Sequence, residues 1–346
     1  MRRRFQAAGS SNAALKDPSG AFSADAAPEP ATPNMLGNGL HLPVREPEIV
    51  ASLESVRADN IPHHEGVYRV DWAGIRTRIG MLPWAPQELA GSTNTDLPIP
   101  TDGYRSEAEE YVALALSLTN DRDSYRVVEV GAGWAPWAVM GVVCAERAGK
   151  RAKGIAVEAE PQRASWARQH SADNGVDSLV TVIEAACWHT ETTLSFPVLD
   201  AIDMGGAVLT GGASPDGSPS MDYRGAFLEH RDVPTVTLNA LLAGDEPTDL
   251  LHVDLQGMEL EVILPALDLI EQKVRFLAVG THNRYIEGML QETLLRREWA
   301  LLLESPSTAI FDGVRPSLTG FTVQDGNQLW ANSRFRDAHP MLIRQR

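Results

Sequence analysis

The chain has 346 residues, of which 43% are hydrophobic and 22% are charged, a composition typical of soluble globular proteins. The 46 acidic and 30 basic residues give a formal net charge of −16. This charge argues against a nucleic-acid binder and against docking on an anionic membrane, because both depend on clustered basic side chains.

The remaining composition predicts a location in the reducing cytoplasm. Only two cysteines occur, Cys144 and Cys187, too few for a disulfide framework or a four-ligand zinc site. The basic start at residues 2–4 is not followed by the apolar segment of a secretion signal. No apolar run approaches the length of about 20 residues that spans a bilayer.

The first two regions of the chain differ in composition and in hydrophobic pattern. Residues 1–45 are rich in Ala, Ser, Pro, Gly and Asn and are expected to form a disordered or loosely attached tail. Residues 46–103 are expected to form an N-terminal extension. Within it, the alternation from Tyr68 to Ile79 predicts a β-hairpin that turns at Gly74.

From residue 104 to residue 346, short apolar strands alternate with helices, which predicts an α/β fold with a doubly wound, mostly parallel sheet. The strands are expected at residues 126–130, 154–157, 179–183, 250–253, 274–279, 300–303, 321–325 and 328–330. The helices are expected at residues 106–118, 136–148, 162–174, 260–272 and 286–297. Residues 200–248 break the alternation and are expected to be an insertion, with a long loop over residues 205–220.

The segment with the clearest chemistry is the strand that ends at Val130 and runs into a glycine-rich turn. Gly131 and Gly133 allow the turn, with Ala132 between them, to approach a ligand closely. Glu158 ends the next strand, at the position where a doubly wound fold holds ribose hydroxyls. Together these elements predict a site for an adenosine-containing ligand. An ordinary strand–helix turn and a helix-capping Glu158 are the structural alternatives.

The spacing around the glycines separates two classes of cofactor. The third glycine of a dinucleotide fingerprint is absent, and Glu129 stands two positions before Gly131. The order acid-x-Gly-x-Gly is the signature of S-adenosylmethionine sites in class I methyltransferases. A carboxylate there supports the amino-acid end of that cofactor, whereas it is a poor neighbour for a pyrophosphate. The pattern therefore favours S-adenosylmethionine over NAD(P).

Three later segments resemble the FkbM-type methyltransferases. The run from Asp249 to Ile263 is similar to their Asp-x-Glu-Gly-x-Glu segment, and the run from Val236 to Leu242 to their lead-in strand. Thr281-His282-Asn283 is similar to the end of their next strand. The resemblance implies that residues 104–346 form a seven-stranded class I methyltransferase domain that binds S-adenosylmethionine.

The resemblance also implies roles for single residues. Asp254 and His282 follow two neighbouring strands, so we expect His282 to act as the base and Asp254 to orient or bind the acceptor. Glu259 is expected to contribute to acceptor binding, and Glu184 and Ala186 to flank the adenine. The structural alternatives are a loop or capping histidine at position 282 and a helix N-cap at position 254.

Two residues depart from the family pattern, because Gln256 and Gly280 stand where the family usually has acids. A metal site formed by His252, Asp254 and His282 is not expected. Magnesium prefers oxygen ligands, and His252 lies along a buried strand.

The leading function is an S-adenosylmethionine-dependent O-methyltransferase that acts on a hydroxyl of a sugar, glycan or secondary metabolite by in-line transfer. An NAD(P)-dependent oxidoreductase and a non-catalytic cofactor-binding domain are the alternatives. The expected partners are the small-molecule or glycan acceptor and a second copy of the chain, with no nucleic acid and no membrane. Residues 46–103 and 205–232 are expected to shape the acceptor site or an oligomer contact.

Overall fold

The part of the chain that the computed structural model describes comprises residues 46–61, 66–97, 108–200, 220–222, 225–311, 313 and 317–338. The tail expected over residues 1–45 lies outside these ranges, as does the loop expected over residues 205–220 apart from Ser220. Within the ranges, no helix is long and apolar enough to cross a membrane.

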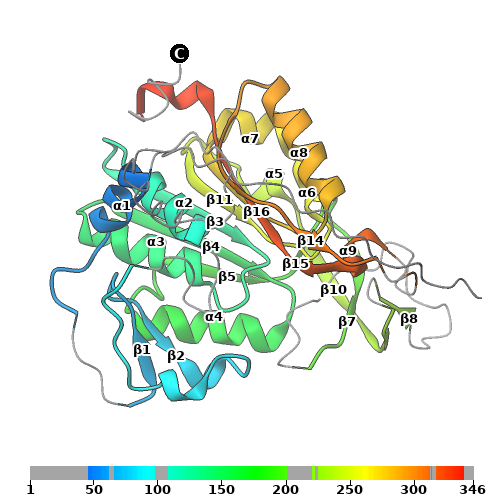
Figure 1. Ribbon diagram of the computed structural model, residues 1–346, viewed down its shortest axis with the longest axis horizontal. Coiled ribbons are helices and arrows are strands. Elements are labelled where there is room, and N and C mark those ends of the chain that lie inside the picture. The colour runs from blue at the N-terminus through cyan, green and yellow to red at the C-terminus, as the bar shows by residue number, and fades with distance from the viewer. Residues whose placement is uncertain are drawn as a thin grey trace, which may run out of the picture. The chain divides into compact units, whose positions relative to one another are not determined.

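A seven-stranded sheet in the order β13-β16-β12-β11-β3-β4-β5 forms the centre of the described part (Figure 1). Its strands are β3 (Ser124–Val130), β4 (Arg151–Glu158), β5 (Val180–Glu184), β11 (Thr248–Val253), β12 (Val274–Thr281), β13 (Ala300–Ser305) and β16 (Gly326–Ala331). Strand β16 is antiparallel to both of its neighbours, and the other adjacent pairs are parallel. The predicted mostly parallel sheet is therefore confirmed.

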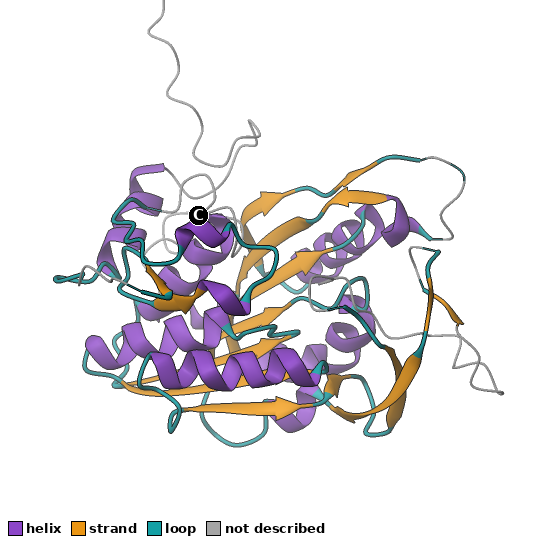
Figure 2. Cartoon of the chain, turned by 90° about the horizontal axis from the view of Figure 1, so that it is seen from below, coloured by secondary structure: helices purple, strands orange, loops and turns teal. Residues whose placement is uncertain are grey.

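Helices cover both faces of this sheet (Figure 2). One face packs against α2 (Ala108–Leu118), α3 (Pro136–Arg147) and α4 (Pro161–Asp173), and α1 (Glu46–Ser55) packs on α2. The other face packs against α5 (Leu238–Leu241), α6 (Glu259–Ile263), α7 (Leu267–Lys273) and α8 (Arg284–Arg296). The fold is thus the doubly wound α/β architecture that the alternation predicts.

Side-chain alternation along the strands explains the two hydrophobic cores. Val127 and Leu250 belong to the core under α2 and α3, whereas Val128 and Leu251 belong to the core under α6 to α8. Successive side chains of a strand point to opposite faces, so a strand covered on both sides needs a continuous apolar run. Such runs are what made these strands recognisable in the sequence.

The N-terminal extension packs on α2 and α4, two of the helices that cover the first face of the sheet. Strands β1 (Tyr68–Val70) and β2 (Arg76–Arg78) pair antiparallel, so the predicted hairpin is confirmed. The guanidinium of Arg78 lies 2.8 Å from the carboxylate of Asp173 on α4. The sequence did not predict α1, whose buried Leu53 shares the core of α2. Two short 3-10 turns follow, η1 (Ile79–Met81) and η2 (Gln87–Leu89).

The region expected to be an insertion, residues 200–248, contains strand β10 (His230–Val236). It pairs with β7 (Thr193–Pro197) and β6 (Ala186–Cys187), and the short strands β8 (Ser220–Met221) and β9 (Phe227–Leu228) pair nearby. Only Val233 of β10 is buried, so the strand has no apolar run by which it could be recognised.

The region after β11 departs from the expected continuous helix over residues 260–272. Helices α6 and α7 are separated by the 3-10 turn η3 (Leu264–Ala266), which contains Pro265. A proline inside a helix lacks the N–H donor and clashes with the preceding turn, so the helix is interrupted there. Further on, the expected strand at residues 321–325 lies outside the central sheet. It is β15 (Thr322–Gln324), which follows α9 (Leu318–Phe321) and pairs with β14 (Thr308–Ala309); the last described element is η4 (Ser333–Ala338).

Candidate active site

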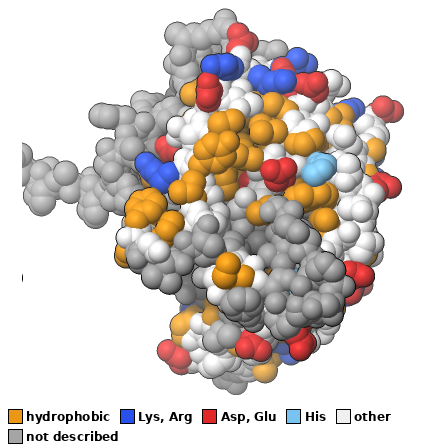
Figure 3. Space-filling view, turned by 90° about the vertical axis from the view of Figure 1, so that its right-hand side faces the viewer, with side chains coloured by type: hydrophobic (Ala, Val, Ile, Leu, Met, Phe, Trp, Pro, Cys, Tyr) orange, Lys and Arg blue, Asp and Glu red, His pale blue; other side chains and the backbone are white. Residues whose placement is uncertain are grey.

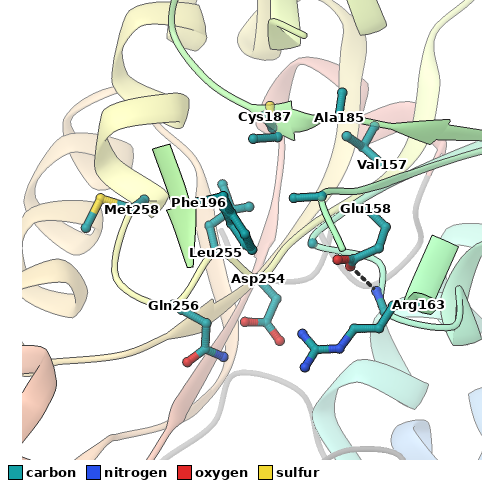
Figure 4. A pocket seen from close by; sticks show the side chains of 14 residues that line it. Val157, Glu158, Arg163, Ala185, Cys187, Phe196, Asp254, Leu255, Gln256 and Met258 are labelled. Carbon is teal, nitrogen blue, oxygen red and sulfur yellow. Dashed lines mark hydrogen bonds between the residues drawn. The ribbon is translucent and has the colours of Figure 1, made fainter. Parts of the chain in front are cut away.

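A pocket opens at the carboxyl ends of β3, β4, β5 and β11, the edge at which open parallel sheets bind ligands. It has a volume of about 710 Å³, part of which is open solvent. Figure 4 shows that apolar residues form one wall, whereas Glu158, Arg163, Asp254 and Gln256 contribute polar side chains.

The glycine-rich turn forms the floor of the pocket. Gly131 has a φ of +74°, and a Cβ atom built there would lie 1.7 Å from the backbone oxygen of Asp254. Only glycine therefore fits where β3 meets the end of β11. The N–H groups of Gly131 and Ala132 both donate to the carbonyl of Val157, at 3.0 and 2.9 Å. Gly131 and Gly133 line the pocket, while Ala132 is buried and fixes the turn.

Glu158 lines the pocket at the end of β4. One carboxylate oxygen accepts a hydrogen bond from the N–H of Gly133 at 2.7 Å, and the other accepts from the N–H of Glu160 at 2.8 Å. Burial raises the pKa of Glu158 above its usual value. The cap of α4 is instead Glu160, which accepts from the N–H of Arg163 at 2.9 Å. Glu158 is thus a carboxylate held in place toward the pocket.

Glu129 lies beneath the glycine-rich turn and is buried. Its carboxylate accepts hydrogen bonds from Ala138 at 2.7 Å and from Trp137 at 3.4 Å, in the first turn of α3. Burial raises its pKa to about 8, in spite of these bonds and the neighbouring His252. His252, which pairs with Glu129 across β11 and β3, bonds through Nε2 to Glu110 on α2. The structure therefore places Glu129 as a support of the turn.

Of the two residues predicted to flank an adenine, only one lies in the wall of the pocket. Ala186 lines the pocket, as expected, together with Ala185 and Phe196. The side chain of Glu184 is 44% exposed and pairs with Arg168 on α4 at 3.3 Å, outside the pocket lining. Phe196 comes from β7 and packs with Val233 of β10, so sequence order alone does not indicate its place.

The structure brings Asp254, His282 and Glu259 together at the ends of β11 and β12. Nε2 of His282 lies 3.3 Å from Oδ1 of Asp254, and Nδ1 lies 2.7 Å from Oε1 of Glu259. His282 is 2% exposed and Glu259 is 0% exposed. The side chain of Asp254 is 39% exposed and lines the pocket, although its Oδ1 atom is shielded. Asp254 is therefore the member of this group that a ligand reaches first.

The charges of this group follow from its geometry. Burial lowers the pKa of His282, but the carboxylates of Glu259 and Asp254 outweigh burial and raise it to about 10. Burial raises the pKa of Asp254 to about 6, against the lowering effect of His282. For Glu259, burial favours the neutral acid, but His282 and backbone hydrogen bonds bring its pKa below the usual value. These shifts favour a protonated His282 beside an ionised Asp254.

This arrangement bears on two roles that the sequence predicted. His282, the expected base, is buried behind Asp254, whereas Asp254 lines the pocket. Glu259 lies behind His282 and also accepts the N–H groups of Leu255 and Gly257, both at 3.0 Å. It is thus placed to hold the histidine rather than to contact an acceptor.

The structural alternatives for the two residues do not match their positions. Asn283 caps α8 by accepting the N–H of Ile286 at 3.0 Å, so His282 is not the cap. The N-cap of α6 is Met258, and the N–H of Asp254 donates to Val130 at 2.9 Å.

The donor atoms of Asp254, Glu259 and His282 lie within 4.8 Å of one another, a spacing that a metal ion can use. Oε1 of Glu259 accepts the three N–H donors described above, whereas its Oε2 is buried without a hydrogen-bond partner in the described part of the chain. The hydrogen bonds join Glu259 and His282, and Asp254 lies next to the histidine. His252, the other histidine weighed for a metal site, bonds to Glu110.

The two departures from the family pattern both lie beside Asp254. A Cβ atom at Gly280 would lie 3.1 Å from Cγ of Asp254, so a larger residue there would press on its carboxylate. Gln256 lines the pocket and adopts a φ of +52°. The chain thus carries neutral residues on both sides of Asp254.

A segment beyond His282 forms the neighbouring surface. Thr322 donates from Oγ1 to the carbonyl of His282 at 2.5 Å, and Asn283 donates to Oγ1 of Thr319 at 2.8 Å. These bonds fasten α9 and β15 beside the active site. Figure 3 faces the side on which α9, β14 and β15 lie, where hydrophobic side chains gather next to acidic ones. The exposed apolar residues of this segment are Ile310, Phe311, Leu318 and Val323.

Sequence analysis missed Arg163, which is 5% exposed and lines the pocket from the first turn of α4. The available signal was its position five residues after Glu158. The first turn of a helix that follows a parallel strand lies at the same edge as the end of that strand.

The chain is similar to known proteins. The family described as the Methyltransferase FkbM domain matches residues 138–298. A protein of Jannaschia sp. (strain CCS1), named as a methyltransferase, is 32% identical over 241 residues, which are 68% of this chain and 84% of that protein.

Two solved structures are among those to which the chain is similar. One is the precorrin-6y C5,15-methyltransferase of Geobacter metallireducens GS-15, with 14% identity and a TM-score of 0.35 over 68% of this chain and 96% of that one. Another is the C-terminal domain of the Rhodobacter capsulatus precorrin-6Y C5,15-methyltransferase, with 11% identity and a TM-score of 0.36 over 73% and 98% of the two chains.

Proposed function

Because the chain belongs to the FkbM methyltransferase family, we propose that it methylates a hydroxyl group of a sugar, a glycan or a secondary metabolite. The family makes it an S-adenosylmethionine-dependent methyltransferase. The sequence left two alternative functions open, an NAD(P)-dependent oxidoreductase and a non-catalytic cofactor-binding domain. Membership of the family favours the methyltransferase over both.

The pocket residues fit the parts of S-adenosylmethionine. The apolar wall of Val157, Ala185 and Phe196 suits an adenine ring. The fixed carboxylate of Glu158 can accept hydrogen bonds from both ribose hydroxyls, each contributing about 1.5–3 kcal/mol. The ionised Asp254 suits the neighbourhood of a sulfonium cation. The residues thus offer partners for the adenine, the ribose and the sulfonium of the cofactor.

The observation that carries the proposal is the position of Asp254, which lines the pocket and is held from behind by His282 and Glu259. When bound, S-adenosylmethionine supplies an electrophilic methyl group, and its transfer to oxygen leaves a thioether and frees the hydroxyl proton. Asp254 accepts a hydrogen bond from the acceptor hydroxyl and takes up that proton. Protonated His282 keeps Asp254 oriented, and Glu259 fixes the imidazole ring.

The surface beside the site supports an acceptor with apolar faces, as sugar rings and many secondary metabolites have. Ile310, Phe311, Leu318 and Val323 are exposed on the segment fastened to His282. We propose that this segment contacts the part of the acceptor next to the reacting hydroxyl. A cytoplasmic location, assembly with a second copy, and independence of nucleic acid and membranes remain proposals.

The experiment that tests the function is an acceptor screen with the full chain and S-adenosylmethionine. Sugars, glycosides and hydroxylated metabolites are compared with matched deoxy compounds, amines and carboxylic acids. Formation of S-adenosylhomocysteine and the methylated product is followed by mass spectrometry. We expect methyl ethers, and none in the deoxy series. Methylation of the amines or carboxylic acids alone would contradict the proposal.

A further inference from the structure

Trp134 belongs to the glycine-rich turn, but its side chain points away from the cofactor pocket into a hydrophobic cluster of its own. The side chain is 5% exposed, and its cluster is separate from the two cores of the sheet. Trp84, which lies between η1 and η2, packs on it with the ring centroids 5.5 Å apart. The other buried members of the cluster come from the N-terminal extension and are Ile79, Met81, Leu82 and Ala85. The extension therefore contacts the turn through Trp134.

Helix α4 holds the backbone of the same residue. Nδ1 of His170 donates to the carbonyl of Trp134 at 3.1 Å. Trp166, also on α4, lies with its ring centroid 6.1 Å from that of Trp84. Trp134 is thus held at its side chain by the extension and at its backbone by α4.

The residues on both sides of Trp134 have a backbone that needs such support. Gly133 and Ala135 have φ values of +55° and +59°. An alanine is strained at a positive φ because its Cβ atom crowds the carbonyl oxygen. Pro136 adds to this strain, since the residue before a proline prefers an extended backbone. A strained backbone persists where the surrounding structure fixes it.

The strained turn carries contacts of the cofactor site. Gly133 lines the pocket, and its N–H group donates to the carboxylate of Glu158 at 2.7 Å. A shift of Trp134 would move Gly133 and with it a contact that holds Glu158. We propose that Trp84 is a positioning residue for the cofactor, which keeps the glycine-rich turn in its binding form through Trp134. This inference rests on the cofactor site proposed above.

The test is calorimetric titration of the full chain with S-adenosylhomocysteine, at a temperature at which thermal unfolding shows each variant to be folded. For Trp84→Ala we expect the Kd to rise about threefold to tenfold, as for the loss of an aromatic contact. Leu53→Ala is the matched control, because it removes a buried side chain of the same extension from another cluster. It should lower the stability but leave the Kd within about twofold.

Two further variants separate positioning from a general loss of packing. Glycine adopts a positive φ without strain, so Ala135→Gly makes the turn depend less on its support. Added to Trp84→Ala, it should lower the raised Kd by about twofold or more. Trp84→Leu keeps an apolar contact and should raise the Kd about twofold to threefold. It carries the test if Trp84→Ala does not fold.

An unchanged Kd in the Trp84 variants would overturn the inference, and so would an equal rise in Leu53→Ala. If Ala135→Gly recovered none of the affinity, the strained turn would not be what Trp84 supports, and the inference would be wrong. A different failure, in which the unaltered chain does not bind S-adenosylhomocysteine, would contradict the proposed cofactor site itself.

Discussion

At the residue scale, the side chains of Glu259, His282 and Asp254 decide where the acceptor proton goes. His282 is enclosed between two carboxylates, so its proton is held firmly. Asp254 is the one of the three that lines the pocket. A buried, protonated histidine is a poor base, whereas a carboxylate with a pKa of about 6 is well matched to accept a proton near neutral pH.

The first prediction concerns Asp254→Asn, which keeps the shape of the side chain and removes its basicity. We expect kcat to fall about 100-fold or more, since general base catalysis contributes about 10²–10⁴-fold. Binding of S-adenosylhomocysteine should be retained. Both are measured with an acceptor from the screen, and Asp268→Asn, at an exposed aspartate, serves as the matched control. Near-normal turnover in Asp254→Asn would rule out Asp254 as the base.

The second prediction concerns the pH dependence of kcat. Asp254 must be ionised to accept a proton, so kcat should rise as the pH rises through about 6. The positive charge of His282 lowers the pKa of Asp254, and its removal in His282→Gln should move this rise to higher pH. The measurement is the pH profile of kcat for both proteins. If the rise disappeared in His282→Gln, His282 rather than Asp254 would be the base.

At the element scale, the site depends on the contact between the turn after β3 and the end of β11. Gly131 fits there because it has no side chain to meet the backbone of Asp254. This contact sets the distance between the cofactor floor and the acid that faces the acceptor.

The third prediction separates this contact from the strain of a positive φ. Gly131 and Gly149 have φ values of +74° and +77°, but a Cβ atom at Gly149 meets nothing within 4 Å. Gly149→Ala should therefore cost only about 1–2 kcal/mol of unfolding free energy, the cost of a left-handed alanine. Gly131→Ala should cost clearly more or lose binding of S-adenosylhomocysteine. Urea unfolding and calorimetry measure both, and equal behaviour of the two variants would contradict the role of the contact.

The same scale shows what the sequence could predict. Gly131, Glu158, Asp254 and His282 each follow an apolar strand, and ends of parallel strands meet at one edge, so their proximity was predictable. The place of Phe196 was not, because β7 reaches the pocket only through its pairing with β10, a strand without an apolar run. The positions of the protons among Glu259, His282 and Asp254 depend on the distances between their side-chain atoms. The spacing of these residues in the sequence does not give those distances.

At the scale of the whole molecule, the N-terminal extension and the sheet share one hydrophobic core. Leu53 of α1 and Trp72 near the hairpin lie in the same cluster as α2 and α3. The boundary predicted near residue 104 therefore separates segments that pack together. Residues 98–107, around that boundary, are outside the described part of the chain.

The fourth prediction tests this shared core. Leu53 is fully buried, and Leu53→Ala should lower the unfolding free energy by about 2–5 kcal/mol through lost burial and a residual cavity. Leu295→Ala, at an exposed leucine of α8, should change it by less than about 0.5 kcal/mol. Urea unfolding that follows the whole chain gives both values. A Leu53→Ala protein as stable as the unaltered chain would show that α1 does not contribute to the core.

The most direct test of the cofactor site is calorimetric titration with S-adenosylhomocysteine of the unaltered chain, Glu158→Ala and Glu184→Ala. The sequence predicted both glutamates as cofactor contacts, but only Glu158 lines the pocket. We predict that Glu158→Ala raises the Kd about tenfold or more and that Glu184→Ala leaves it within about twofold. Thermal unfolding controls for the fold, and Glu158→Gln provides a second, conservative variant. Loss of binding in Glu184→Ala but not in Glu158→Ala, or no binding by the unaltered chain, would contradict this site.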